Sequence, residues 1–184
     1  MILDLGCGTS KRRGAIGVDY SPLPGVDVVH DLNDVPYPFA SSTADEIYMD
    51  NVLEHLEDVV ATVDELHRIA KGGALVTVYV PYFRSGWAAV DPTHRHQFTV
   101  DSFGYFDPSH PFFDRYRYST ARLRLEAVRF NERWPARGWR ARVARIANRN
   151  PQRYEARFSQ FFPLGELTFR LRVIKDEASS PTGR

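Results

Sequence analysis

The feature that most constrains this chain is a series of three short apolar runs within its first 31 residues. They occupy residues 1–5, 16–18 and 26–29, and each ends at a glycine or an aspartate. Short runs of aliphatic and β-branched residues between turn residues are typical of strands buried on both faces of a parallel sheet. Ligands of such sheets bind beyond the carboxyl ends of the strands. The three run ends therefore predict a pocket for a nucleoside.

The residues at these ends suit that ligand. Gly6 and Gly8 let a ligand approach the main chain closely. Asp19 is placed to accept hydrogen bonds from both hydroxyls of a ribose. Asp31 is placed to accept one from an exocyclic amine, while the apolar side chain of Leu32 covers the base.

This arrangement resembles the S-adenosylmethionine (SAM) site of class I methyltransferases. The glycine turn of that family is matched at residues 4–8, its ribose acid at Asp19 and its adenine acid at Asp31, and the likeness continues through residues 45–48 and 51–56 to Gly72 and Gly73. The chain looks like a short, methyltransferase type 11-like form that lacks the N-terminal helices. The resemblance implies SAM as cofactor and the following cofactor-binding residues: Asp4, Gly6, Cys7, Gly8, Asp19, Tyr20, Asp31, Leu32, Asp50 and Asn51.

The chain departs from the family between Gly8 and Ile16. Only residues 9–15 separate the glycine turn from the second run, and Ser10 stands where a third glycine is usual. The first helix is therefore expected to be a single turn or absent. This argues against a nicotinamide dinucleotide, because a pyrophosphate needs a helix N-terminus at that place. Lys11 or Arg12 either pairs with the methionine carboxylate of SAM or is a solvated loop cation.

The expected fold is α/β: a Rossmann-like, mostly parallel seven-stranded sheet with an antiparallel last strand and helices on both faces. Residues 44–49 and 74–80 read as buried strands, and residues 57–71 as an amphipathic helix that Gly72 and Gly73 stop. Residues 123–130 and 166–175 alternate apolar and polar side chains and predict the last two strands. Residues 1–175 are expected to form one domain, and residues 176–184 a disordered tail.

The expected chemistry lies beyond residue 50. His55 is the histidine of this half nearest to it, and it could take a proton from a hydroxyl or amine nucleophile. The alternative is that His55 only lines the pocket, since methyl transfer often needs little beyond alignment. In the loop 81–97, Tyr82, His94 and His96 are expected to contact the substrate. Asp91 with the two histidines could suggest a metal site, but their spacing defines no constellation of ligands, so no metal is expected.

A basic segment at residues 133–163 is expected as an insertion between the last two strands. Eight arginines are interleaved with aromatic residues and face one acidic residue, Glu155. They are Arg133, Arg137, Arg140, Arg142, Arg145, Arg149, Arg153 and Arg157. Such a segment could bind nucleic acid, form a lid over an anionic or small substrate, or serve as a scaffold or oligomer contact.

The bulk properties narrow the function. A net charge of +1 predicts no general attraction to nucleic acid or membranes. The single cysteine, Cys7, excludes an intramolecular disulfide and fits a reducing cytoplasm. No apolar run reaches the roughly 18 residues that span a bilayer, and no signal peptide is expected, since the chain opens on a strand.

The resemblance thus implies transfer of a methyl group from SAM to an oxygen or nitrogen of a small-molecule or sugar-type acceptor. Asp50 and Asn51 are not followed by the Pro-Pro-aromatic run of adenine and glutamine N-methyltransferases, so base amines and amides are disfavoured as acceptors. Two alternatives stay open: a SAM-binding partner subunit without catalysis, and a nucleic-acid methyltransferase that uses the basic residues 133–157. The chain could also form a homodimer instead of serving as a partner subunit.

Overall fold

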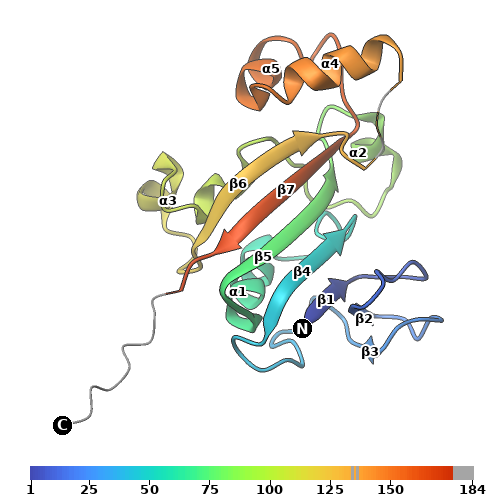
Figure 1. Cartoon of the computed structure of the whole chain (residues 1–184), viewed down its shortest axis with the longest axis vertical. Helices are drawn as coiled ribbons and strands as arrows, with labels where there is room; N and C mark the ends of the chain where they lie inside the picture. Colours follow the sequence, from blue (N-terminus) through green and yellow to red (C-terminus); the bar gives the residue numbers. More distant parts are fainter. Residues whose placement is uncertain (134, 136, 176–184) are drawn as a thin grey trace.

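The computed structural model describes residues 1–133, 135 and 137–175. Its centre is a seven-stranded sheet in the order β3-β2-β1-β4-β5-β7-β6 (Figure 1). The strands are β1 (Ile2–Leu5), β2 (Ile16–Asp19), β3 (Val28–Val29), β4 (Ala44–Asp50), β5 (Ala70–Pro81), β6 (Leu123–Phe130) and β7 (Glu166–Val173). β1 to β5 pair in parallel, and β7 runs antiparallel to both β5 and β6. The predicted sheet with its reversed last strand is confirmed.

The described helices are short. They are α1 (Val59–Ile69), α2 (Gly86–Val90), the 3₁₀ helix η1 (Ser102–Phe106), α3 (Pro111–Tyr116), α4 (Trp139–Ala147) and α5 (Pro151–Arg157). Figure 1 shows α1 packed behind β4 and β5, and α4 and α5 beyond the upper end of β6. No described helix is long and apolar enough to cross a membrane.

Helix α1 starts at Val59, two residues later than predicted, with Asp58 as its N-cap. The Asp58 side chain accepts a hydrogen bond from the Ala61 N–H, which caps the first turn. Val63, Leu66 and Ile69 are fully buried on the face toward the sheet. The predicted end of the helix is wrong: the strand already begins at Ala70, because the Ala70 backbone pairs with Ala44 of β4.

The glycine pair therefore has another role than the expected helix stop. Gly72 and Gly73 lie within β5, at the irregular stretch between the Ala44–Ala70 and Glu46–Leu75 pairs. Gly73 has a φ of +81°, which glycine adopts without strain. The pair lets the chain turn from the helix directly into the longest strand of the sheet.

The connection between β1 and β2 contains no helix, as predicted. Instead, Gly6 and Cys7 both donate backbone hydrogen bonds to the Val18 carbonyl, with N···O distances of 2.7 and 3.0 Å. The glycine turn is thereby fastened to the neighbouring strand. This leaves the space beyond the end of β1 open.

The core lies on both faces of the central strands. Leu3 and Leu5 of β1 pair with Ile47 and Met49 of β4, and these four side chains on one face have no exposed surface. In β5 consecutive residues from Val76 to Val80 are buried, so that strand is covered on both faces. The predicted loop 81–97 contains the short helix α2, and another short helix, α3, lies between η1 and β6. The proposed tail, residues 176–184, lies outside the described residues.

Candidate functional site

A cavity of about 540 Å³ lies beyond the carboxyl ends of β1 and β4. Its wall comes from the glycine turn, the loop after it, the end of β4 and the segment after β6. The lining residues are Asp4, Gly6, Cys7, Ser10, Arg12, Asp50 and Arg133. The expected cofactor residues Asp4, Gly6, Cys7 and Asp50 thus face one cavity, at the sheet edge where the strand pattern predicts a ligand.

The glycine turn forms a bare floor for this cavity. Gly6 and Gly8 have φ values of +72° and +50°. A Cβ at Gly6 would lie 2.2 Å from a methyl group of Val52, so any side chain there would collide with the turn that follows β4. A Cβ at Gly8 would meet nothing within 4 Å. The Gly6 position is closed by packing, whereas the Gly8 backbone borders open space.

Asp4 holds the loop that follows the turn. Its Oδ2 accepts a hydrogen bond from the Arg12 N–H at 2.6 Å, and the Arg12 guanidinium lies 3.7 Å from the centroid of the Tyr48 ring. Lys11 points elsewhere and pairs with Asp27 at 2.7 Å. Of the two loop cations that the sequence leaves open, Arg12 is the one on the cavity wall.

Asp19 lies beneath the glycine turn with 6 % of its surface exposed. One carboxylate oxygen accepts the Gly8 N–H at 2.9 Å, and the other accepts the Ser21 N–H at 3.1 Å. Each oxygen has a second lone pair, so the carboxylate can still accept from a ligand. Tyr20, next in the chain, is 76 % exposed and turned to solvent.

Asp31 and Leu32 follow β3 as expected for a base site. Asp31 is exposed and accepts from the backbone and side-chain nitrogens of Asn33. Leu32 is 5 % exposed, and its carbonyl accepts a 3.0 Å hydrogen bond from the Tyr37 hydroxyl. Burial raises the pKa of Tyr37 to about 12, so this hydroxyl remains a donor at neutral pH.

Arg133 closes the far side of the cavity. Its guanidinium forms an ion pair with Asp50 and another, at 3.1 Å, with Glu166 of β7. It also lies 4.9 Å from the centroid of the Tyr79 ring. Asn51, with a φ of +51°, donates to Asp50 from its side chain. The sequence shows Arg133 only as one of many arginines, and no pattern distinguishes it from the rest.

The predicted catalytic residue, His55, lies in the turn after β4. Its Nδ1 is 2.9 Å from the Thr93 hydroxyl, and burial lowers its pKa. The neutral ring therefore predominates at pH 7. Beside it lie His94, with its ring centroid 4.7 Å away, and Glu54, which is 1 % exposed. Burial raises the pKa of Glu54 to about 8. Glu54 was missed at the sequence level because a glutamate beside apolar residues carries no distinct signal.

None of the three expected substrate residues, Tyr82, His94 and His96, lines the 540 Å³ cavity. Tyr82 is fully buried and packs edge-on against Phe130, with ring centroids 5.0 Å apart. His96 places its Nε2 2.9 Å from the Leu56 carbonyl and so fastens the loop to the turn after β4. In the structure both residues support the walls of the site from outside.

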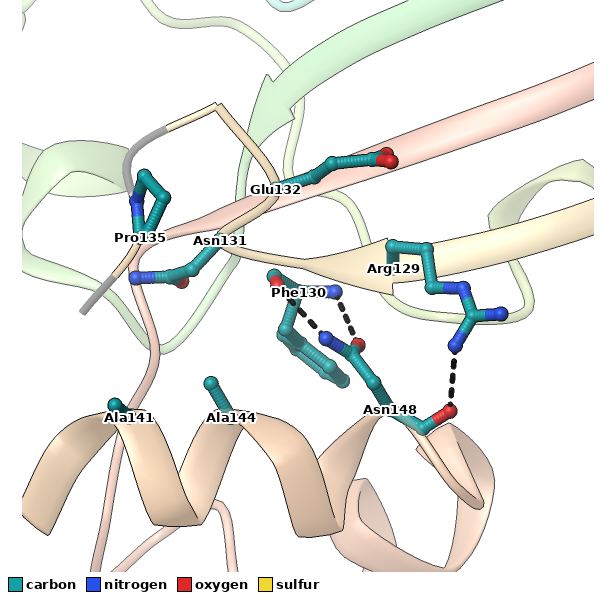
Figure 2. A pocket seen from close by; sticks show the side chains of 8 residues that line it. All are labelled: Arg129, Phe130, Asn131, Glu132, Pro135, Ala141, Ala144 and Asn148. Atoms are coloured by element: carbon teal, nitrogen blue, oxygen red, sulfur yellow. Dashed lines mark hydrogen bonds between the residues drawn. The ribbon is translucent and has the colours of Figure 1, made fainter.

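A second, smaller cavity of about 200 Å³ lies between the end of β6 and α4 (Figure 2). Asn148 spans it by accepting from the Phe130 N–H at 2.7 Å and donating to the Phe130 carbonyl at 3.0 Å. Ala141 and Ala144 present small side chains from α4. The polar groups of Asn148 and Phe130 already pair with each other between β6 and the end of α4. We therefore interpret this cavity as a packing gap.

The comparisons with known proteins agree with this architecture. Residues 3–78 match the family model described as "Methyltransferase domain". No curated protein matches the sequence significantly. A SAM-dependent methyltransferase from Archaeoglobus fulgidus superposes with a TM-score of 0.58 at 17 % identity, over 93 % of this chain and 85 % of that one.

Two further structures are similarly related. The complex between the Haloferax volcanii Trm112 methyltransferase activator and the putative methyltransferase gives a TM-score of 0.56 at 16 % identity, over 95 % of this chain and 82 % of that one. The [4+2]-cyclase SpnF gives a TM-score of 0.56 at 17 % identity, over 95 % of this chain and 74 % of that one. The resemblance seen in the sequence is therefore confirmed: residues 3–78 match a methyltransferase-domain model, and the chain has the fold of SAM-dependent methyltransferases.

Proposed function

We propose that the chain transfers a methyl group from SAM, held in the 540 Å³ cavity, to an oxygen or nitrogen of a small-molecule or sugar-type acceptor. The observation that carries this proposal is the order of the strand ends along one edge of the sheet, where the glycine turn lines the cavity. A bare glycine turn follows β1, and carboxylates follow at Asp19 and Asp31. A reducing, cytoplasmic setting belongs to the proposal and is supported by the single cysteine.

The residues present fit this cofactor. Asp19 keeps lone pairs for the ribose hydroxyls, and Asp31 with buried Leu32 suits the adenine. Arg12 on the cavity wall suits the methionine carboxylate, and Asp4 suits the ammonium group. When bound, SAM supplies a methyl group activated by the adjacent sulfonium.

The protein itself would contribute alignment and a proton acceptor. An acceptor approaching from the turn after β4 would meet His55, whose lowered pKa leaves the ring neutral. With Nδ1 turned toward the Thr93 hydroxyl, Nε2 is the atom available to take a proton. Such a base adds to the rate for a hydroxyl acceptor and is dispensable for an acceptor that is already nucleophilic.

The variant Asp19→Asn tests the cofactor site. It keeps the shape and one acceptor oxygen but removes the charge that strengthens hydrogen bonds to two hydroxyls. Hydrogen bonds to charged groups are worth about 1.5–3 kcal/mol each, so we expect SAM affinity to fall by about 100-fold in calorimetry. Asp34→Asn, a change at an exposed carboxylate, is the control. Unchanged affinity in a folded Asp19→Asn protein would refute the placement of the ribose.

A second candidate, a SAM-binding partner subunit, is favoured by one observation. Tyr20, Leu23 and Val29, around β2 and β3, are 76 %, 38 % and 58 % exposed. In Figure 1 the described helices lie away from β2 and β3. The Haloferax relative is found in a complex with an activator. A partner subunit of this kind would bind SAM without turnover. The double variant Leu23→Ser/Val29→Ser would abolish capture of the partner and leave SAM affinity unchanged.

A further inference from the structure

A second cluster of polar side chains lies in the turn after β4 and the loop after α2. Glu54, His55 and His94 each bring one nitrogen or oxygen to within 4.8 Å of the others. The three residues come from two segments that are far apart in the sequence. Backbone hydrogen bonds from Arg95 and His96 to the Glu54 carbonyl, at 2.8 and 3.2 Å, hold these segments together.

Glu54 is the unusual member of the cluster. Its side chain is 1 % exposed, and neither carboxylate oxygen has a hydrogen-bond partner within the described part of the chain. The neighbouring His94 Nε2 lies 4.0 Å from Oε1, beyond hydrogen-bond distance. Burying a carboxyl group without a partner is costly. A bound cation would remove that cost, because it would compensate the charge and complete the coordination of both oxygens.

The two histidines are oriented as metal ligands usually are. His94 Nδ1 lies 3.2 Å from the Ala88 carbonyl, which can only accept, so Nδ1 carries the proton and Nε2 the lone pair. The Thr93 hydroxyl donates to Asp91 at 2.7 Å and therefore accepts from His55 Nδ1 at 2.9 Å. Fixing one ring nitrogen as a donor leaves the other free to bind a metal.

We propose that Glu54, His55 and His94 bind a divalent transition-metal ion of the zinc class. Two imidazole nitrogens and one carboxylate form a donor set known for zinc sites that keep an open position. Donor atoms around a tetrahedral ion with bonds of about 2.1 Å lie roughly 3.4 Å apart. The three side chains would thus close by about 1 Å on binding. The Asp91 carboxylate would orient His55 through the Thr93 hydroxyl, which donates to Asp91 and accepts from His55 Nδ1.

This inference goes beyond the proposed methyl transfer and does not rest on SAM binding. A metal ion on His55 Nε2 would replace the proton-acceptor role proposed above for that atom. The inference also differs from the expectation drawn from the sequence, in which Asp91, His94 and His96 were considered and no metal was expected. Spacing along the chain could not reveal that Glu54 and His55 lie against His94. The structure turns His96 away, toward the Leu56 carbonyl.

The test uses the full chain, stripped with a chelator and titrated with Zn²⁺ and with Co²⁺ as a spectroscopic probe. We expect one equivalent of either ion, with the intense visible absorption of tetrahedral Co²⁺. Glu54→Gln and His94→Ala should each weaken Zn²⁺ binding at least tenfold. His96→Gln, a histidine change in the same loop, should leave binding unchanged.

Thermal unfolding separates loss of the site from loss of the fold. In chelator, Glu54→Gln should melt no lower than the wild type, because a neutral amide replaces a buried carboxyl. Saturating Zn²⁺ should raise the melting temperature of the wild type only. The proposal is overturned if the wild type binds no Zn²⁺, if Glu54→Gln binds it as tightly as the wild type, or if His96→Gln weakens binding equally. Calorimetry of the stripped protein with SAM reports on the proposed methyltransferase site separately.

Discussion

At the scale of single residues, the cavity depends on a backbone conformation that is open to few side chains. Gly6 and Gly14 both have positive φ, at +72° and +80°, but only Gly6 has a neighbour that excludes a Cβ. Val52 reaches it because the turn after β4 folds back over the end of β1. The glycine turn is thus packed against the turn that follows β4.

This pair of glycines provides a matched test. Gly14→Ala should cost about 1 kcal/mol of unfolding free energy, from the left-handed conformation alone. Gly6→Ala should cost about 2 kcal/mol more than Gly14→Ala. The new methyl group would lie 2.2 Å from a methyl group of Val52 and would have to displace it. Urea denaturation measures both. Equal losses at the two positions would contradict the packing of Val52 against the glycine turn.

Residue identity alone predicted part of this site. Gly6 could be placed at the cavity because it ends an apolar run, and a strand pattern indicates which end of the strand meets a ligand. The contacts of Asp19 and Asp31 with a cofactor stay predictions. Tyr82 could not be assigned correctly to core or surface, since an aromatic residue after a strand suits either place. Glu54 was missed for a similar reason: only the fold shows that its carboxyl group is buried without a partner.

At the scale of elements, helix α1 supports the base side of the cavity through one carboxylate. Glu65 accepts from the Tyr37 N–H at 2.8 Å and from Arg68 Nη2 at 2.7 Å. Arg68 in turn donates to the Phe39 and Tyr37 carbonyls. Since the Tyr37 hydroxyl holds the Leu32 carbonyl, the helix positions the loop that covers the expected adenine.

This contact has a defined pH dependence. The hydrogen bond from Arg68 holds the pKa of Glu65 below its usual 4.5. Because the pKa of Glu65 is lower in the folded state, its carboxylate stabilises the fold fully above pH 4.5. This stabilisation is lost as the pH falls through the pKa of Glu65 in the folded state. Glu65→Gln should therefore lower the unfolding free energy by about 1–2 kcal/mol at pH 7, and the difference should shrink as the pH falls below 4.5.

The control for this prediction is Glu57→Gln. Glu57 pairs with Arg95 at 3.2 Å, but both side chains are more than half exposed. Such a pair contributes about 0–1 kcal/mol. If Glu65→Gln and Glu57→Gln had the same effect across the pH range, the buried link between α1 and the loop would be absent.

The segment between β6 and β7 is joined to the site by Arg133. Its partner Glu166 has a side chain that is 10 % exposed, and Asp50 lies at the end of β4. Arg133→Ala should cost about 2 kcal/mol of stability, because it leaves a largely buried carboxylate without its cation. Adding Glu166→Gln should recover part of that loss in a double-mutant cycle. The control is Arg140→Ala, which removes a guanidinium lying over the exposed Trp139 ring and should change stability little. If the losses of stability at Arg133 and Glu166 were purely additive, the ion pair between them would be refuted.

The internal structure of this segment was beyond prediction from the sequence. The large apolar residues between its arginines do not line one continuous helical face, so the sequence pattern did not indicate the two helices α4 and α5. Ala144, Ala147 and Tyr154 are the buried residues that anchor them, and two of these are too small to create a periodic signal. The expected lid, scaffold or nucleic-acid roles of the remaining arginines stay predictions.

At the scale of the whole molecule, the strand order decides which residues meet. β1 lies between β2 and β4, so the glycine turn, Asp19 and Asp50 gather at one edge although they are distant in sequence. The mostly parallel sheet with its reversed last strand could be predicted, because buried runs and two amphipathic strands follow the pattern of a known fold. Contacts made by loops, such as Arg133 with Asp50 or His94 with Glu54, depend on packing that no sequence period records.

The central claim is that this edge of the sheet binds SAM, and calorimetric titration of the purified chain with SAM, S-adenosylhomocysteine and NAD tests it most directly. The account predicts micromolar binding of the first two and none of NAD, because no helix N-terminus stands between β1 and β2 to hold a pyrophosphate. Binding of NAD, or failure of both SAM and its product to bind the folded chain, would contradict it.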